Sequence, residues 1–212
     1  MSPGPSMTQI EPAAACTIRR PLAGGRAAVP LDAVFPGASS SSTSDPREIV
    51  PGADAADPGR CPGELPSRPT CQSIVPWADL TDEEFAQASR VSRLVDGYLL
   101  TMPQLAGNQS PPESSPGTKV VTYRLLDVAP ADPGKLGTYL DGAFRTCARA
   151  RDSTVAGVDA LVGTVRSEYG SGAAQVVLLT RGSHVLWAQL DGSGWVAGER
   201  ERALKVLVAR LL

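Results

Sequence analysis

The chain has 212 residues, of which 42% are hydrophobic and only 5% aromatic, and its formal net charge is −2 at pH 7. With 20 basic and 22 acidic residues and no basic stripe, the sequence excludes nucleic acid binding as a main function. No apolar run is long enough for a transmembrane helix, which excludes an integral membrane protein of the helical kind.

Residues 1–70 are rich in proline, glycine and serine and poor in large apolar side chains. Thirteen of the 19 prolines lie at or before Pro76. Because such a segment cannot bury enough apolar surface to offset the entropy cost of ordering, we expect a flexible, largely irregular region or tether over 1–70. A folded domain is expected over 71–212. Within the first region, RAAVPLDAVF (26–35) is expected to form a helical turn that docks onto this domain.

The domain is predicted to begin with a helix and two strands. Thr81-Asp82-Glu83-Glu84 is a capping box, which predicts a helix from Thr81 to about Ser89. A strand to about Met102 is expected next. The polar, proline-broken run 104–117 then predicts a loop, and KVVTYRLLDV (119–128) has the apolar pattern of a strand.

The second half of the domain continues with alternating strands and helices. Asp132 and Pro133 are typical of the cap and first position of a helix. Further elements are a strand in DALVGTVRSEYG (159–170), a hairpin over 173–192 turning at Arg181-Gly182, and an amphipathic helix from Glu199 to Leu212. Long antiparallel strands with few helices predict an α+β fold, an antiparallel β-sheet with its helices on one face.

The four cysteines indicate the compartment. Cys16, Cys61, Cys71 and Cys147 are widely spaced, without the close pairs typical of zinc ligands, so no metal site is expected. An even count favours disulfides in an oxidising exterior, with three possible pairings; reduced cytosolic thiols are the alternative. A Cys71–Cys147 bridge would stabilise by roughly 4 kcal/mol, whereas Cys61–Cys71 would pin only a local loop.

Cys16 also raises the question of a lipid anchor. The run MSPGPSMTQIEPAAAC ends in small residues before this cysteine, as a bacterial lipobox does. The apolar segment that should precede a lipobox is absent, because Glu11 and Pro12 stand in its place. A lipid or peripheral anchor at Cys16 is therefore possible but is not the main expectation.

The sequence offers few groups for catalysis. His184 is the only histidine, and it falls on a predicted strand, where a lone histidine is more often packed or exposed than catalytic. No GxSxG motif occurs. The run Gly192–Gly198 follows a strand and precedes a helix, but its GxGxxxG spacing and Trp195 do not fit a dinucleotide fingerprint. We therefore expect no catalytic residue and no cofactor.

Two groups of side chains are candidates for binding. Arg145 and Arg149 lie one helical turn apart and could hold an anion; alternatively, with Arg151, they complement the carboxyl end of the helix. The three tryptophans could line a groove for an apolar ligand or a peptide, or belong to the core. Among the residues of the hairpin, Trp187 is the candidate for ligand contact.

The order of elements resembles the extracellular sensor domain of mycobacterial PknH-type Ser/Thr kinases and related actinobacterial lipoproteins. The resemblance covers about residues 71–212 and rests on KVVTYRLLDV, a helix ending at Cys147 (LGTYLDGAFRTCAR), a sheet hairpin and the closing RALKVLVARLL. An actinobacterial source also fits the 17 arginines against 3 lysines.

The resemblance implies an antiparallel sheet with helices, disulfides and a cleft for a ligand. By similarity, Cys71 and Cys147 match cysteines of that family. The family's further cysteine in the C-terminal strand has no counterpart in HVLWAQLDGSGW, so Cys16 and Cys61 would have to form a different second bridge.

Together these observations predict a non-catalytic, sensor-like binding protein that is secreted or associated with the cell envelope. Its partner would be a small molecule, a cell-wall fragment, a lipid or a protein. Two alternatives stay open. One is a small enzyme or enzyme inhibitor that uses the loop 104–117 and holds an anion with Arg145 and Arg149. The other is a cytosolic partner-binding protein with reduced thiols.

Overall fold

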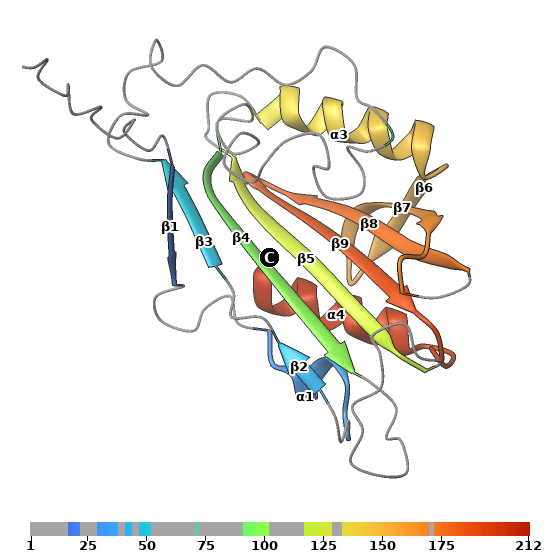
Figure 1. Cartoon of the computed structure of the whole chain (residues 1–212). Coiled ribbons are helices and arrows are strands. Elements are labelled where there is room, and N and C mark those ends of the chain that lie inside the picture. The colour runs from blue at the N-terminus through green and yellow to red at the C-terminus, as the bar shows by residue number, and fades with distance from the viewer. Residues whose placement is uncertain are drawn as a thin grey trace, which may run out of the picture.

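The computed structural model describes residues 17–21, 29–37, 41–43, 47–51, 71, 91–101, 117–128, 133–169 and 172–212. Figure 1 shows their arrangement as a long twisted sheet with helices. The elements are β1 (Thr17–Pro21), α1 (Leu31–Val34), β2 (Ser41–Thr43), β3 (Arg47–Pro51), β4 (Val91–Thr101), β5 (Lys119–Val128), α3 (Pro133–Cys147), β6 (Arg151–Val155), β7 (Val158–Arg166), β8 (Ala173–Arg181), β9 (His184–Gly192) and α4 (Glu199–Leu211).

The described strands form one antiparallel sheet. Its order is β1-β3-β4-β5-β9-β8-β7-β6, and β2 pairs with β4 beyond the end of β3. The centre of the sheet is made by β5 and β9, which are far apart in the sequence and pair from Lys119 opposite Gly192 to Asp127 opposite His184. The predicted α+β class, an antiparallel sheet packed by a few helices, is confirmed.

The two long helices lie on opposite faces of this sheet, so the expectation that the helices share one face is wrong. Leu186, Ala188 and Leu190 of β9 point to the face covered by α4 and α1. Val185 and Trp187 point to the other face and pack against Phe144 of α3. Because both faces are covered, β9 is buried along almost its whole length, which explains its nearly unbroken apolar run.

Several sequence predictions agree closely with these elements. The strand over 119–128, the helix that begins at Pro133 and the final helix from Glu199 are all present. The hairpin of β8 and β9 is also present, with its turn one residue later than predicted, at Gly182-Ser183. The predicted helix over 81–89 and the cap at Asp132 lie outside the described residues.

One strand in the second half was missed. β6 pairs with β7 through a two-residue turn at Ala156-Gly157, where both residues have positive φ, 51° and 79°. Positive φ at both central positions is typical of the tight hairpin turns that match the twist of a sheet. The predicted strand 159–170 is the second arm of this hairpin and ends earlier, at Arg166.

The N-terminal region contributes more to the fold than the sequence predicts. Three short strands, β1, β2 and β3, extend or flank the sheet beside β4. These strands form by backbone pairing with a neighbouring strand, which does not require a long apolar run, while most of residues 1–70 lies outside the described part of the chain. The predicted docking turn is present as α1, where Val34 and Phe35 are buried in the core beneath α4.

Candidate functional site

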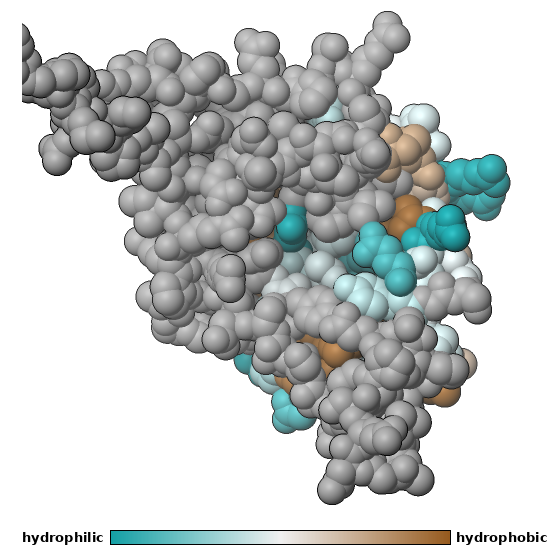
Figure 2. All heavy atoms as spheres, in the orientation of Figure 1, coloured by the Kyte–Doolittle hydropathy of each residue, from teal (hydrophilic) through white to brown (hydrophobic). Residues whose placement is uncertain are grey.

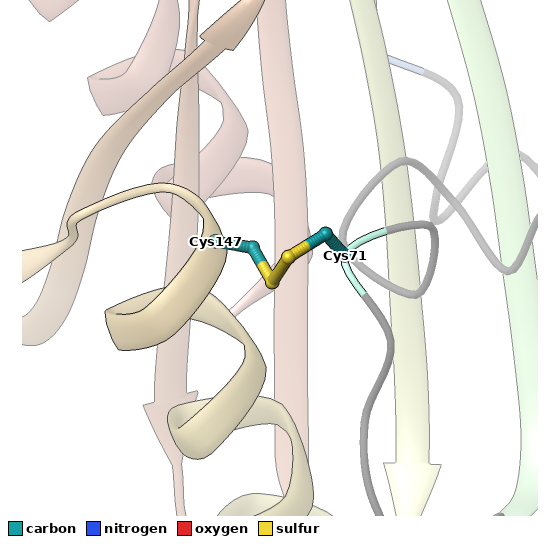
Figure 3. Close-up of a disulfide and its surroundings, with 2 residues drawn as sticks. All are labelled: Cys71 and Cys147. Carbon is teal, nitrogen blue, oxygen red and sulfur yellow. A yellow bond between two sulfur atoms is a disulfide. The ribbon is translucent and has the colours of Figure 1, made fainter.

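Cys71 and Cys147 form a disulfide, with their Cα atoms 5.1 Å apart. Figure 3 shows the bond joining the last residue of α3 to a segment that precedes β4 in the chain. The sequence left three pairings of the four cysteines open. The observed bond is the Cys71–Cys147 bridge, which closes a long loop and which the family resemblance implied. Cys16 and Cys61, and with them the question of a second bridge or a lipid anchor, lie outside the described residues.

The chain that follows Cys147 is held tightly against β7. The amides of Ala148 and Ala150 both donate to the Phe144 carbonyl, at 3.0 and 3.1 Å. The Ala148 carbonyl in turn accepts from the amide of Thr164, at 3.0 Å. A Cβ atom at Gly163 would lie 2.6 Å from that carbonyl oxygen, so glycine is needed where the two segments cross. Arg149 sits inside this connection with a φ of 50°.

A solvent-open hollow of about 510 Å³ lies beside this connection. It is called the arginine hollow below. Its lining residues are Ala148, Arg149, Arg151, Val162, Gly163, Thr164, Gln175 and Arg200. Among these described lining residues, three carry a guanidinium and none carries a carboxylate. Figure 2 shows hydrophilic surface on the side of the molecule where α3 ends and β6 begins.

The strand register explains why these side chains converge. Arg151 is opposite Val162, and Thr164 is opposite Gln175. Residues opposite one another in a sheet project to the same face, and Val162 packs against the core on the α4 side. Arg151, Thr164 and Gln175 therefore share the face on which α4 lies, and α4 brings Arg200 to the hollow. Neither Arg149 nor Arg151 forms an ion pair with a described residue.

Arg200 is the most constrained of the three arginines. Its Cζ atom lies 5.5 Å from the centroid of the Trp195 ring, and its Nε atom is buried without a hydrogen-bond partner among the described residues. Burial lowers the pKa of this guanidinium, an effect that the negative charge of Asp191 opposes. The sequence gives no sign of Arg200 as a site residue, because an arginine in the first turn of an amphipathic helix has no pattern that separates it from other surface residues.

Trp195 is itself fixed from two sides. Its indole nitrogen donates to the Asp191 carbonyl at 2.7 Å, and its ring centroid lies 5.8 Å from that of Phe35. The α4 N-terminus beside it is held by Glu199, whose Oε2 atom accepts from Lys119 Nζ at 2.7 Å and from the Val196 amide at 2.9 Å. These contacts hold the Trp195 ring and the N-terminus of α4 against β5, β9 and the end of α1.

Arg145 does not join the arginine hollow. Its guanidinium binds Asp141 at 2.9 Å and Asp152 at 2.6 Å on the α3 side, and these two carboxylates raise its pKa. The predicted pair of Arg145 and Arg149 is therefore divided between two places. Arg149 lines the hollow, together with Arg151, which sequence analysis had placed in the same cluster.

A second open hollow, of about 400 Å³, lies near Arg145. Its lining residues are Thr138, Asp141, Asp152, Asp159, Ala160, Leu161, Leu178 and Thr180. Two of its three carboxylates already accept from Arg145. Among the described residues, no group of three histidine, cysteine, aspartate or glutamate side chains is placed to bind a metal ion.

The two candidates from the β8–β9 hairpin, Trp187 and His184, both lie away from the two hollows. Trp187 is only 1% exposed and lies in the core beneath α3, so it offers almost no surface to a ligand. His184 lies at the start of β9, where its Nε2 atom is 3.2 Å from Asp127 Oδ1. The described structure places His184 outside the lining of both hollows.

The Gly192–Gly198 run forms the turn between β9 and α4. A Cβ atom at Gly192 would collide with the carbonyl oxygen of Thr118, and one at Gly194 would lie 3.0 Å from the Cα atom of Gly117. The Ser193 amide donates to the Thr118 carbonyl at 2.7 Å. These glycines allow two loops to cross closely, which accounts for them without a nucleotide.

No protein-family model matches this chain, and no curated protein matches its sequence. The chain is similar in fold to a crystal structure of the extracellular domain of PknH from Mycobacterium tuberculosis. The two are 11% identical, with a TM-score of 0.47, over 84% of this chain and 88% of that one. No helix in the described part of the chain has the length and apolar character to cross a membrane.

Proposed function

We propose that this protein is a non-catalytic, sensor-like binding module that works outside the cytoplasm and takes its ligand in the arginine hollow. The observation that carries the proposal is the hollow itself, in which Arg149, Arg151 and Arg200 converge on about 510 Å³ of open space. That volume lies within the roughly 300–1,000 Å³ of small-molecule sites.

The build of the hollow supports binding. Its arginines come from a connection pinned to β7 and from a helix whose N-terminus is tied to β5. Because the backbone segments that carry these arginines are already held, less freedom is lost when a ligand arrives, so binding is stronger for the same contacts. Thr164 and Gln175 add a hydroxyl and an amide that can orient a ligand.

The disulfide supports a location outside the cytoplasm. A bond between Cys71 and Cys147 persists in oxidising compartments such as the cell envelope and the exterior, and is rare in a reducing cytosol. The position of His184 supports a role without catalysis, because the chain's one histidine lies beside Asp127 and is not among the described lining residues of the arginine hollow. An enzyme that uses Arg145 and Arg149 together has less support, since the structure separates them.

The proposal is tested by nuclear magnetic resonance of the full, ¹⁵N-labelled chain against fragments in three classes: anionic, neutral and cationic. We expect fragments of at least one class to shift the amide signals of Thr164 and Gln175. Thr164→Trp, which fills the arginine hollow, should abolish these shifts. Thr180→Trp, the same change in the other hollow, should leave them intact. If no fragment of any class moves these signals, the proposed function is wrong.

A further inference from the structure

We propose that the ligand of the arginine hollow is a small anion with more than one negative group, of the kind that a diphosphate or a polycarboxylate presents. This inference rests on the proposed function and adds the chemical class of the ligand. It follows from the charges of the lining, the donors that remain unused and the size of the space.

The positive charges of Arg149 and Arg151 are not compensated by any described residue, whereas the charge of Arg200 is partly offset by the nearby carboxylate of Asp191. Arg149, Arg151 and Arg200 line it without a carboxylate, and like charges brought together repel one another. The charge of Arg145, by contrast, is compensated within the protein, because two carboxylates of the same chain bind its guanidinium. Arg149 and Arg151 have no such partner among the described residues, so an anion from outside would relieve the repulsion in the arginine hollow.

The donors suit phosphate-like or carboxylate groups. Each guanidinium presents a planar set of N–H groups that binds two oxygens of one anion at once. The Nε of Arg200 is buried without a hydrogen-bond partner among the described residues, so the terminal N–H groups of this guanidinium are the donors that remain for a ligand. The Trp195 ring holds this guanidinium through a cation–π contact, which limits its movement before a ligand binds.

The size of the space favours more than one anionic group. A single inorganic phosphate would fill only part of about 510 Å³, and the three guanidiniums come from different segments, the α3–β6 connection, β6 and α4. Two or more anionic groups on one molecule can each meet a different arginine. The exposure of Arg149 and Arg151 leaves the site open from solvent, so no conformational change is needed for entry.

The test is calorimetric titration of the full chain with inorganic pyrophosphate and with citrate at low salt. We expect binding of at least one of them, weakened at least about tenfold by Arg151→Gln or Arg200→Gln, and further by the double variant. Matched controls are Arg181→Gln, at the exposed end of a strand, and Arg210→Gln, at the other end of α4; both should bind as the original chain does. Because Arg151 is an exposed strand residue, its variant should keep the original unfolding midpoint.

A parallel arm separates a free anion from a lipid headgroup. Vesicles that contain cardiolipin, whose headgroup carries two phosphates, are compared with vesicles of phosphatidylcholine in sedimentation with the same variants. Binding to pyrophosphate or citrate supports a free anion, and binding to anionic vesicles alone supports a headgroup, provided in each case that the double variant loses it. Binding that the double variant retains, or no binding in any arm, overturns the inference. If neutral or cationic fragments still shift Thr164 and Gln175, the proposed function survives that result.

Discussion

Arg200 lies over the indole ring of Trp195, with its Cζ atom 5.5 Å from the ring centroid. The ring is in turn held by its hydrogen bond to the Asp191 carbonyl and by Phe35 of the N-terminal region. A residue before the predicted domain boundary therefore helps to support an arginine of the candidate site. The contact between Phe35 and Trp195 therefore links the packing of the core to the position of Arg200 in the arginine hollow.

Replacing Trp195 should affect stability and binding together. Trp195→Phe keeps an aromatic ring but removes the 2.7 Å hydrogen bond to Asp191, which should cost about 1 kcal/mol of unfolding free energy. Trp195→Leu also removes the cation–π contact and should weaken pyrophosphate binding more than Trp195→Phe does. Urea unfolding and calorimetry measure the two effects. Equal binding by the two variants would show that the ring does not position Arg200.

Replacing Trp187 should affect stability alone. Its side chain is 1% exposed and fills the core beneath α3, so Trp187→Ala should lower the unfolding free energy by about 3–5 kcal/mol. Urea unfolding followed by circular dichroism measures this, with Trp187→Phe as the milder comparison. At temperatures where the variant remains folded, pyrophosphate binding should match that of the original chain. A loss of binding by the folded variant would restore Trp187 as a ligand contact.

Removing the disulfide should loosen both the fold and the site. The Cys71→Ser, Cys147→Ser double variant loses the bridge of α3, and on the loop-entropy model this costs roughly 4 kcal/mol. Since Arg149 and Arg151 follow Cys147 closely, pyrophosphate affinity should also fall. Alkylation of native protein without reductant, read by mass spectrometry, should leave Cys71 and Cys147 unlabelled. Labelling of both would contradict the bridge and the extracytoplasmic location.

The Lys119–Glu199 ion pair should make stability depend on pH in acid. Burial, the largest single effect, raises the pKa of Glu199, but the hydrogen bonds from Lys119 and from the Val196 amide outweigh it, so the pKa lies below its usual range. A lowered folded-state pKa gives stability that is present above the unfolded value of about 4.3 and is lost as the pH falls through the folded value.

The measurement is urea unfolding of the original chain and of Glu199→Gln between neutral and strongly acid pH. The variant should be less stable at neutral pH, and the difference should shrink as Glu199 becomes protonated. Glu201→Gln is the matched control, because Glu201 pairs with Lys205 on the exposed face of the same helix and should change stability less. A difference that stays constant down to strongly acid pH would contradict the role of the ion pair.

Much of the sheet could be predicted because its central strands are long and apolar. The runs that became β5 and β9 are buried on both faces, and such runs are visible without any partner. β6 was missed because its burial pattern is exposed except at Val155, so it lacks the alternation that identifies a half-buried strand. The short N-terminal strands join the sheet through backbone pairing, which leaves no periodic signal in side chains.

The candidate site could be predicted only in part. From the sequence, Arg145 and Arg149 were expected on one helix face with Arg151 nearby, but α3 ends at Cys147, before Arg149, and the partner of Arg145 could not be predicted. Asp152 lies beyond the end of α3, and only the turn into β6 brings it to Arg145. Arg200 reaches the same hollow from a segment far along the chain, through a helix whose place depends on the pairing of β5 with β9.

The most direct measurement is a crystal structure of the protein grown with pyrophosphate, with tungstate as a heavier anion in a second crystal. We expect density for the anion in the arginine hollow, within hydrogen-bond distance of Arg151 and Arg200 and close to Arg149. The anomalous signal of tungsten should fall at the same place. Anion density only elsewhere on the molecule, with the arginine hollow holding water alone, would contradict the central claim.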